Sequence, residues 1–318
     1  MKRLQNRIAE SALTLPVAAV VGGVAWLLAG LWPQQLWPQL ACFVATVYLM
    51  VELSNHNALL RVRSRMVTST FIVLSSTAPF LLPQMVGGVV QLCFVVAFLL
   101  LFQTYQNPQS PGTVFYAFVS LGLASLTYVY TLWYVPVLWL LMGTQLQALS
   151  WRSVAASLLG LSAPYWFVFV WLLMPFGRTE AWQPDLSPLG RHFASLSNLA
   201  PSAAAFSLGH ALSLVFTLLM AVVGMVHFWQ YSFEDKVRIR LLYGFFTSMT
   251  MVTLFFGLLQ PQHADVLMRI LFVCASPLIA HVLTFTSSRL SNILFFVALA
   301  AAFALIVFNL LSTTALTS

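Results

Sequence analysis

The segment LLQPQHADVLMRILF, residues 258–272, places three ionisable side chains within seven positions: His263, Asp265 and Arg269. In a helix that begins near Pro261, Asp265 and Arg269 stand four residues apart on one face, which suits an ion pair. One interpretation is a local pair that lets Arg269 lie below the membrane surface with its guanidinium turned outward. The other is that Arg269 faces a polar cavity and binds an anionic group, because ionisable residues within membrane spans are costly and usually serve a site.

A second polar segment, residues 176–205, adds cations and imidazoles that could act together with these residues. It reads FGRTEAWQPDLSPLGRHFASLSNLAPSAAA and is the longest connection between apolar runs. Arg binds phosphate groups in a bidentate manner and His is a suitable base near neutral pH, so the set fits the handling of a saccharide on polyprenyl diphosphate. The predicted substrate-binding residues are Arg178, Arg191 and Arg269, and the predicted catalytic residues are His192, His263 and Asp265.

The composition places these residues in a membrane protein. Hydrophobic residues make up 60% of the chain and charged residues 7%, whereas soluble domains carry about 25% charged residues. Apolar runs of about 20 residues recur, long enough to cross a hydrocarbon core as helices. They lack the alternation of barrel strands. We therefore predict an all-α fold, a polytopic transmembrane helix bundle that forms one integral membrane domain over residues 1–318.

Eleven apolar runs are the predicted membrane spans. The basic start MKRLQNRIAE precedes an apolar stretch that is longer than the core of a cleavable signal peptide, so the first run is predicted to remain as a span. Two neighbouring runs, 113–126 and 128–146, are counted separately because merging them removes the charge bias of the loops. The eleven spans are residues 13–31, 38–53, 66–83, 86–104, 113–126, 128–146, 153–175, 206–228, 241–259, 265–286 and 293–314.

The basic residues set the predicted orientation, since short cytoplasmic loops collect Lys and Arg. With a cytoplasmic N-terminus, eleven of the fourteen Lys and Arg residues fall in inner loops. The C-terminus is then periplasmic, residues 176–205 form an outer loop, and the protein lies in the cell inner membrane. The inner set is Lys2, Arg3, Arg7, Arg61, Arg63, Arg65, Arg152, Lys236, Arg238, Arg240 and Arg289.

Three features on the predicted inner side have less specific interpretations. The segment EDKVRIR, residues 234–240, is most simply a solvated helix extension. The segment VELSNHNALLRVRSRM, residues 51–66, is typical of a loop held against anionic head groups, with a phosphate-binding site as the alternative. His281, four residues after Pro277, is either a hydrogen-bonded contact between helices or a proton carrier.

Several kinds of site are not indicated. The three cysteines, Cys42, Cys93 and Cys274, lie in apolar runs without a CxxC pattern, which predicts neither a disulfide framework nor a thiolate zinc site. There is no glycine loop for phosphates, no HExxH and no acidic cluster for magnesium, so no cofactor and no metal are predicted. The net charge of +7 is assigned to membrane lipids as partners and not to nucleic acid.

Three stretches resemble a family of uncharacterised multi-span inner-membrane proteins of Bacteroidota: LLRVRSRMVTSTFIVLSSTAPFLLP, SFEDKVRIRLLYGFF and LLQPQHADVLMRILFVCASPLIAHVLTFTSSRLSNILFF. The resemblance extends over most of the chain and implies a membrane location, but brings no activity or catalytic residues. The layout, many spans with one long outer loop bearing Arg and His, is similar to that of O-antigen polymerases and ligases. The first outer loop, WPQQLWPQ, lacks the carboxylate that large membrane glycosyltransferases usually carry there.

Three functions follow as hypotheses. The first is an enzyme that handles polyprenyl-diphosphate-linked saccharides at the outer leaflet, with the residues named above. The second is a transporter in which Arg269, His281 and Glu52 line a path. The third is a non-catalytic membrane subunit whose loops bind a membrane protein partner.

Overall fold

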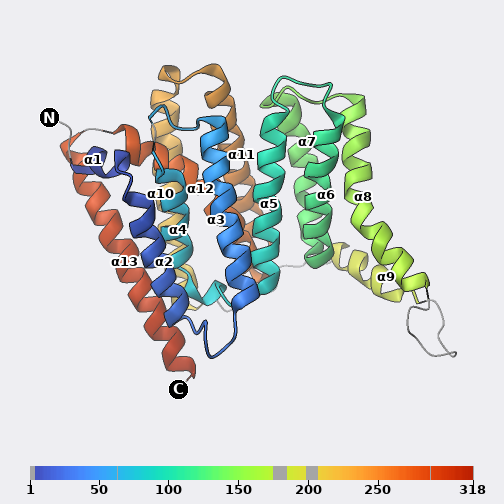
Figure 1. Cartoon of the computed structure of the whole chain (residues 1–318), viewed down its shortest axis with the longest axis horizontal. Coiled ribbons are helices and arrows are strands. Elements are labelled where there is room, and N and C mark those ends of the chain that lie inside the picture. The colour runs from blue at the N-terminus through green and yellow to red at the C-terminus, as the bar shows by residue number, and fades with distance from the viewer. Residues whose placement is uncertain (1–3, 63, 175–184, 198–206, 287, 318) are drawn as a thin grey trace. The chain divides into compact units, whose positions relative to one another are not determined.

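A computed structural model describes residues 4–62, 64–174, 185–197, 207–286 and 288–317. All regular elements over these residues are helices (Figure 1). The chain forms two compact units, and each is described by itself. Unit 1 comprises Met1–Leu92 and Ser202–Ser318, and unit 2 comprises Cys93–Pro201. The predicted helical class is therefore confirmed.

Unit 1 is built from the two ends of the chain. Its α-helices are α1 (Leu4–Glu10), α2 (Thr14–Leu28), α3 (Trp37–Asn57), α4 (Met66–Ser76), the first part of α5 (Met85–Gln103), α10 (Leu208–Tyr231), α11 (Val237–Leu259), α12 (Ala264–Phe285) and α13 (Arg289–Thr317). Short 3-10 helices connect some of them: η1 (Pro79–Leu81), η4 (Ser232–Glu234) and η5 (Pro261–His263).

Helix α12 forms the core of unit 1. Every residue from Val266 to His281 is buried, because α4, α10 and α11 all pack against it. Helix α10 approaches closely at Gly224, where an added Cβ would lie 2.8 Å from the carbonyl carbon of Leu278. In a membrane, where helices gain little from burying apolar surface, such close backbone contact is a main source of helix association.

Unit 2 contains the second part of α5, α6 (Pro111–Thr127), η2 (Val129–Trp133), α7 (Tyr134–Thr144), α8 (Trp151–Leu173), α9 (Ser187–Ala194) and η3 (Ser195–Ser197). Helices α6 and α8 pack tightly through Gly122, where an added Cβ would lie 2.8 Å from the carbonyl oxygen of Leu161. Ser150 caps α8 by accepting from the backbone N–H of Ser153, and the Ser153 hydroxyl accepts in return from the Ser150 N–H.

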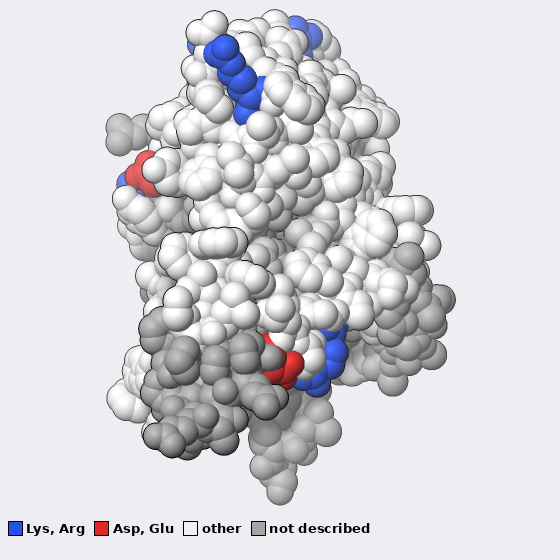
Figure 2. All heavy atoms as spheres, turned by 90° about the vertical axis from the view of Figure 1, so that its right-hand side faces the viewer, with Lys and Arg blue, Asp and Glu red and all other residues white. Residues whose placement is uncertain are grey.

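The face of the molecule that carries α8 is apolar in its middle. Figure 2 shows a wide band of this face with no Lys, Arg, Asp or Glu among the described residues, between charged atoms toward its two ends. Exposed side chains of α8 include Leu159, Trp166 and Phe167. An exposed apolar helix face of this kind suits contact with lipid.

Seven helices of the described chain are long and apolar enough to cross a membrane. The count rises to eight if α1 and α2, which meet at a bend of 84°, form one broken span. The protein is thus a multi-pass membrane protein. Each of the eleven predicted ranges coincides with a helix, but α4, α6 and the η2–α7 segment are shorter than a full span. Eleven crossings therefore remain a prediction.

The boundary between residues 113–126 and 128–146 is a break between two helices. Tyr128 adopts an extended conformation, with φ −148° and ψ 94°, and separates α6 from η2. The two runs are therefore not one continuous helix, as predicted.

One end of unit 1 gathers its basic residues. Figure 1 shows α1 and the connections α3–α4, α10–α11 and α12–α13 at the same end, which we call the charged end. Among the described Lys and Arg residues of unit 1, Arg269 alone lies toward the opposite end. The described basic residues of the charged end are Arg7, Arg61, Arg65, Lys236, Arg238, Arg240 and Arg289.

Candidate functional site

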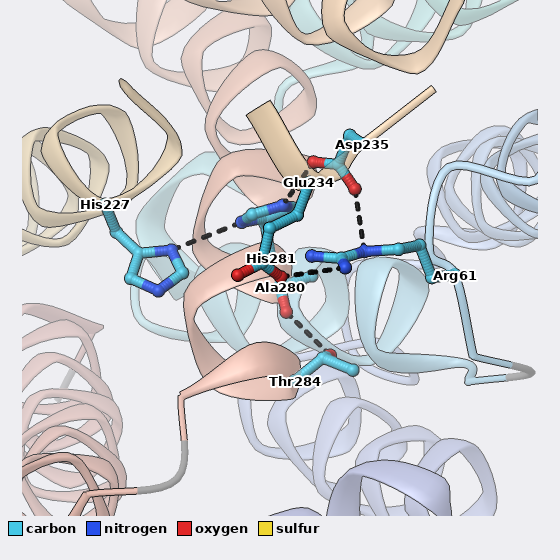
Figure 3. A network of polar contacts seen from close by, with 7 residues as sticks. All are labelled: Arg61, His227, Glu234, Asp235, Ala280, His281 and Thr284. Carbon is cyan, nitrogen blue, oxygen red and sulfur yellow. Dashed lines mark hydrogen bonds and ion pairs between the residues drawn. The ribbon is translucent and has the colours of Figure 1, made fainter. Parts of the chain in front are cut away.

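The charged end of unit 1 contains a network of polar contacts that joins four parts of the chain (Figure 3). Its centre is His281 of α12, whose Nε2 lies 3.1 Å from Oδ2 of Asp235. The His281 side chain is 0% exposed, and that of Asp235, in the link from η4 to α11, is 1% exposed. An ionised carboxylate only accepts hydrogen bonds, so Nε2 of His281 carries the hydrogen. Buried ionisable groups within a membrane bundle are costly and mark a candidate site.

Arg61 extends the network from the α3–α4 connection to the surface. Its Nε lies 2.8 Å from Oδ1 of Asp235, and its Nη1 donates to Oε2 of Glu234 over 3.0 Å. The guanidinium carbon lies 4.5 Å from the centre of the Phe285 ring, in a cation–π contact. The Arg61 and Glu234 side chains are 32% and 45% exposed, so the ion pairs lead from the buried carboxylate to solvent.

His227 of α10 extends the network on the other side of His281. The two Nδ1 atoms lie 3.3 Å apart, and the His227 ring stacks on Tyr231 with a centroid distance of 4.7 Å. A hydrogen bond between two ring nitrogens needs one hydrogen. Because neutral His281 carries its hydrogen on Nε2, the hydrogen between the Nδ1 atoms belongs to His227. His227 is only half-buried, so it is the accessible end of the pair.

Helix α1 holds the turn that follows His281. Gln5 donates from Nε2 to the carbonyl oxygen of Leu283 over 2.8 Å, and Asn6 donates from Nδ2 to that of Thr284 over 3.2 Å. These carbonyls belong to the last turn of α12, and the carbonyls of a last helical turn have no N–H donor within the helix. The side chains of α1 therefore fix the end of the helix that presents His281.

At the opposite end of unit 1, Asp265 pairs with α10 and with the α4–α5 connection. Its Oδ1 lies 3.2 Å from Nε2 of His210, and its Oδ2 accepts from Nε2 of Gln84 over 2.6 Å. The His210 ring also lies 3.8 Å from the ring of Phe80, centre to centre. Among the described residues the ion-pair partner of Asp265 is thus His210 and not Arg269, so the predicted spacing-of-four pair does not form.

Arg269 is buried and donates to backbone carbonyls. Its Nη2 donates to the carbonyl oxygen of Leu81 and, over 3.3 Å, to that of Gln84. Gly87 of α5 makes the space, because an added Cβ there would lie 2.8 Å from Cδ of Arg269. Nη2 of the guanidinium therefore satisfies two carbonyls of a turn, whereas its buried Nε has no hydrogen-bond partner among the described residues.

The remaining predicted residues are divided between the two units. His263 ends η5 in unit 1, next to Asp265, and is partly buried. Arg191 and His192 belong to α9 in unit 2. Arg178 lies outside the described residues. The structure thus brings His263, Asp265 and Arg269 to one end of unit 1.

In unit 2, His192 connects α9 to α6. Its Nε2 lies 2.9 Å from the carbonyl oxygen of Ser125, which can only accept, so Nε2 carries the hydrogen and Nδ1 is the nitrogen able to take up a proton. Arg191 is exposed. The pKa of Asp185 lies below its usual value because the backbone N–H and the hydroxyl of Ser187 donate to the carboxylate, with Arg191 adding a cation.

Unit 1 also has a partly open apolar pocket of about 410 Å³ between α1, α2, α4, α10, α12 and α13. Aliphatic, aromatic and methionine side chains line it, together with hydroxyls such as Ser11 and Thr14. Most of the lining lies in the half of unit 1 nearer the charged end, including Ile8 of α1 and Met66 of α4. Its volume lies within the range of small-molecule sites.

Asp235 was not predicted from the sequence as a site residue. The segment EDKVRIR was expected to extend a helix into solvent, but α11 begins only at Val237 and the Asp235 side chain is buried. That expectation was wrong for Asp235, because the chain turns inward at η4 to meet His281 and Arg61. The sequence signal that pointed to this cluster was that residues 234–240, His281 and Arg61 were all predicted at the inner side of the membrane.

No family model, no curated protein and no solved structure matches the chain. The class of the protein therefore comes from the fold alone, a multi-pass helical membrane protein. The resemblance to an inner-membrane family of Bacteroidota stays a prediction.

Proposed function

We propose that the chain is a multi-pass inner-membrane protein that handles a lipid-linked substrate, with a saccharide on polyprenyl diphosphate as the substrate class. The observation that carries this proposal is the apolar pocket of unit 1. In the proposal, the hydrocarbon chain of the substrate lies in this pocket. Three of the helices that line the pocket, α10, α12 and α13, are long and apolar enough to cross a membrane, so a lipid chain can enter from the bilayer without passing through water.

Specificity for such a substrate comes from its head group. A hydrocarbon chain that moves from lipid into an apolar pocket gains little hydrophobic free energy, because lipid tails are as apolar as the pocket wall. An anionic head group supplies the missing selectivity through contacts with cations. Two exposed cations stand next to pocket residues in the chain: Arg7 precedes Ile8, and Arg65 precedes Met66.

The head group therefore lies at the charged end in this proposal. His227 supports the same placement. It is seven residues beyond Met220, which lines the pocket, and so lies on the same face of α10, about 10 Å nearer the charged end. A head group at the charged end would lie on the side of unit 1 that carries this imidazole. The outer-leaflet site with Arg178, Arg191 and Arg269 stays a separate prediction.

Lipid analysis of the protein purified from membranes tests the proposal. Wild-type protein is expected to carry a polyprenyl diphosphate lipid by mass spectrometry. Ala298→Phe fills the pocket from α13 and is expected to abolish this lipid, whereas Ala300→Phe, an exposed position two residues along the same helix, retains it. Wild-type protein without such a lipid, or Ala298→Phe with an undiminished amount, would contradict the proposal.

A second set of variants places the head group. Replacement of Arg7 and Arg65 by Gln is expected to weaken lipid retention, because it removes two exposed cations near the pocket. Arg269→Gln is expected to retain the lipid, since the Arg269 guanidinium is bonded to backbone carbonyls. Loss of lipid in Arg269→Gln alone would move the head group to the opposite end and favour the outer-leaflet prediction.

The two other functions remain proposals of lower rank. A transporter is favoured by one specific observation, the buried His281–Asp235 pair, and predicts substrate flux in proteoliposomes. A non-catalytic subunit predicts a second protein that co-purifies in fixed ratio.

A further inference from the structure

We propose that His227, His281 and Asp235 form a proton-transfer path, with His227 as the residue that exchanges a proton with a ligand or water. The inference rests on the contacts at the charged end and not on the apolar pocket, so it holds for an enzyme and for a transporter alike.

The hydrogen bonds of the path all run in one direction. Nδ1 of His227 lies 3.3 Å from Nδ1 of His281, and Nε2 of His281 lies 3.1 Å from Oδ2 of Asp235. With neutral imidazoles and an ionised carboxylate, His227 donates in the first contact and His281 in the second. With both imidazoles neutral and the carboxylate charged, each link has one hydrogen and one acceptor. The Nε2 atom of His227 is then the one ring nitrogen of the pair left to take up a proton.

The surroundings favour one mobile proton and disfavour two. Arg61 and Glu234 face the pair on the side of the Asp235 carboxylate. Two phenols also face it: the Tyr243 ring of α11 lies 5.0 Å from the His281 ring, and the Tyr231 ring stacks on that of His227. One added proton on the imidazoles is balanced by Asp235. A second would place two imidazolium rings 5.3 Å apart in a largely apolar site, which is strongly unfavourable.

His227 takes a proton at Nε2, and its Nδ1–H bond breaks as the Nδ1–H bond of His281 forms. The Nε2–H bond of His281 then breaks, and the proton joins Oδ2 of Asp235. The net change is one proton moved from the His227 side to the carboxylate, with both imidazoles left neutral in the opposite tautomers. The neutral acid releases Arg61, which keeps Glu234 as its exposed partner.

This release gives the path a consequence at the surface. Arg61 links the α3–α4 connection to the link before α11 only through Asp235 and Glu234 among the described ion pairs. Protonation of Asp235 removes the ion pair of Arg61 with the buried carboxylate and leaves its pair with Glu234, which solvent screens.

Nitrogen-15 NMR of the protein in lipid bilayers, labelled at histidine, tests the path. At pH 8 we expect His281 to carry its hydrogen on Nε2, with a coupling across the hydrogen bond between the Nδ1 atoms of His227 and His281. His227→Gln and His281→Gln assign the signals, and exposed His56→Gln is the matched control. A His281 hydrogen on Nδ1, or the absence of the coupling, would overturn the proposal without any variant at Asp235.

Acidification then tests the role of the carboxylate. The pair is expected to take up one proton and not two as the pH falls. In Asp235→Asn the pH of this uptake is expected to fall by about one to three units, because the opposite charge beside His281 is gone. Uptake of two protons by the pair, or the same titration in both proteins, would contradict the path.

Discussion

The sequence allows two interpretations of Arg269 and does not distinguish between them. Its position within an apolar run predicted either a local ion pair or an anion site. In the structure Arg269 forms no ion pair with Asp265 among the described residues: it bonds to the carbonyls of the α4–α5 turn, in a space left by Gly87. The anion site stays a prediction. The partner depended on where α5 packs, which residue spacing within one helix does not reveal.

The two adjacent glycines of α5 test this role of Arg269. An added Cβ at Gly87 would lie 2.8 Å from Cδ and Nε of Arg269, whereas at Gly88 the nearest atom, Nη1, would lie at 3.7 Å. Both changes to Ala gain the same helix propensity. We therefore expect Gly87→Ala to unfold with a free energy about 1–3 kcal/mol lower than Gly88→Ala, the usual cost of overpacking.

Denaturation of both variants in mixed micelles measures this difference. Equal free energies of unfolding would show that Arg269 can move away at no cost and is not held by the turn.

At the scale of elements, the sequence located the helices better than their lengths. Each of the eleven predicted ranges contains a helix, because hydropathy marks where apolar segments lie. It does not mark where a helix ends: α4 stops at Ser76, before the 3-10 turn that begins at Pro79, although the apolar run continues. An eleven-residue helix rises about 16 Å, roughly half of a hydrocarbon core.

The junction of α10, α11 and α12 with the α3–α4 connection was predicted only in part. His281 was expected as a contact between helices or as a proton carrier, and a contact with His227 of α10 is present. Its carboxylate partner could not be found from periodicity, because Asp235 lies in a non-helical link whose direction is set by the packing of α11.

Asp235→Ala tests whether this junction is held by the buried carboxylate. The change leaves His281 without an acceptor for its buried Nε2–H and removes one ion pair of Arg61. We expect the free energy of unfolding to fall by about 3–5 kcal/mol, the range for breaking a buried pair. The neighbouring Glu234→Ala removes the same charge at a side chain that is 45% exposed and is expected to cost less than about 1 kcal/mol.

Chemical denaturation of the two variants side by side decides the point. A similar small loss in both would mean that the buried pair contributes little to holding the four segments together.

At the scale of the whole molecule, the functional assignments depend on which end of unit 1 faces the cytoplasm. The proton path and the basic residues near the pocket lie at the charged end. The predicted residues His263, Asp265 and Arg269 lie at the opposite end. The rule that cytoplasmic loops collect Lys and Arg predicts that the charged end is inside, and the structure brings seven described basic residues of unit 1 to that end.

Cysteine labelling in intact cells tests this orientation most directly. In a chain with Cys42, Cys93 and Cys274 changed to Ala, exposed Gln34 before α3 and exposed Lys236 before α11 are each replaced by Cys. We predict that an impermeant maleimide modifies Gln34→Cys in intact cells and modifies Lys236→Cys only after the inner membrane is permeabilised. The reverse pattern would contradict the account, because the proton path would then open to the periplasm.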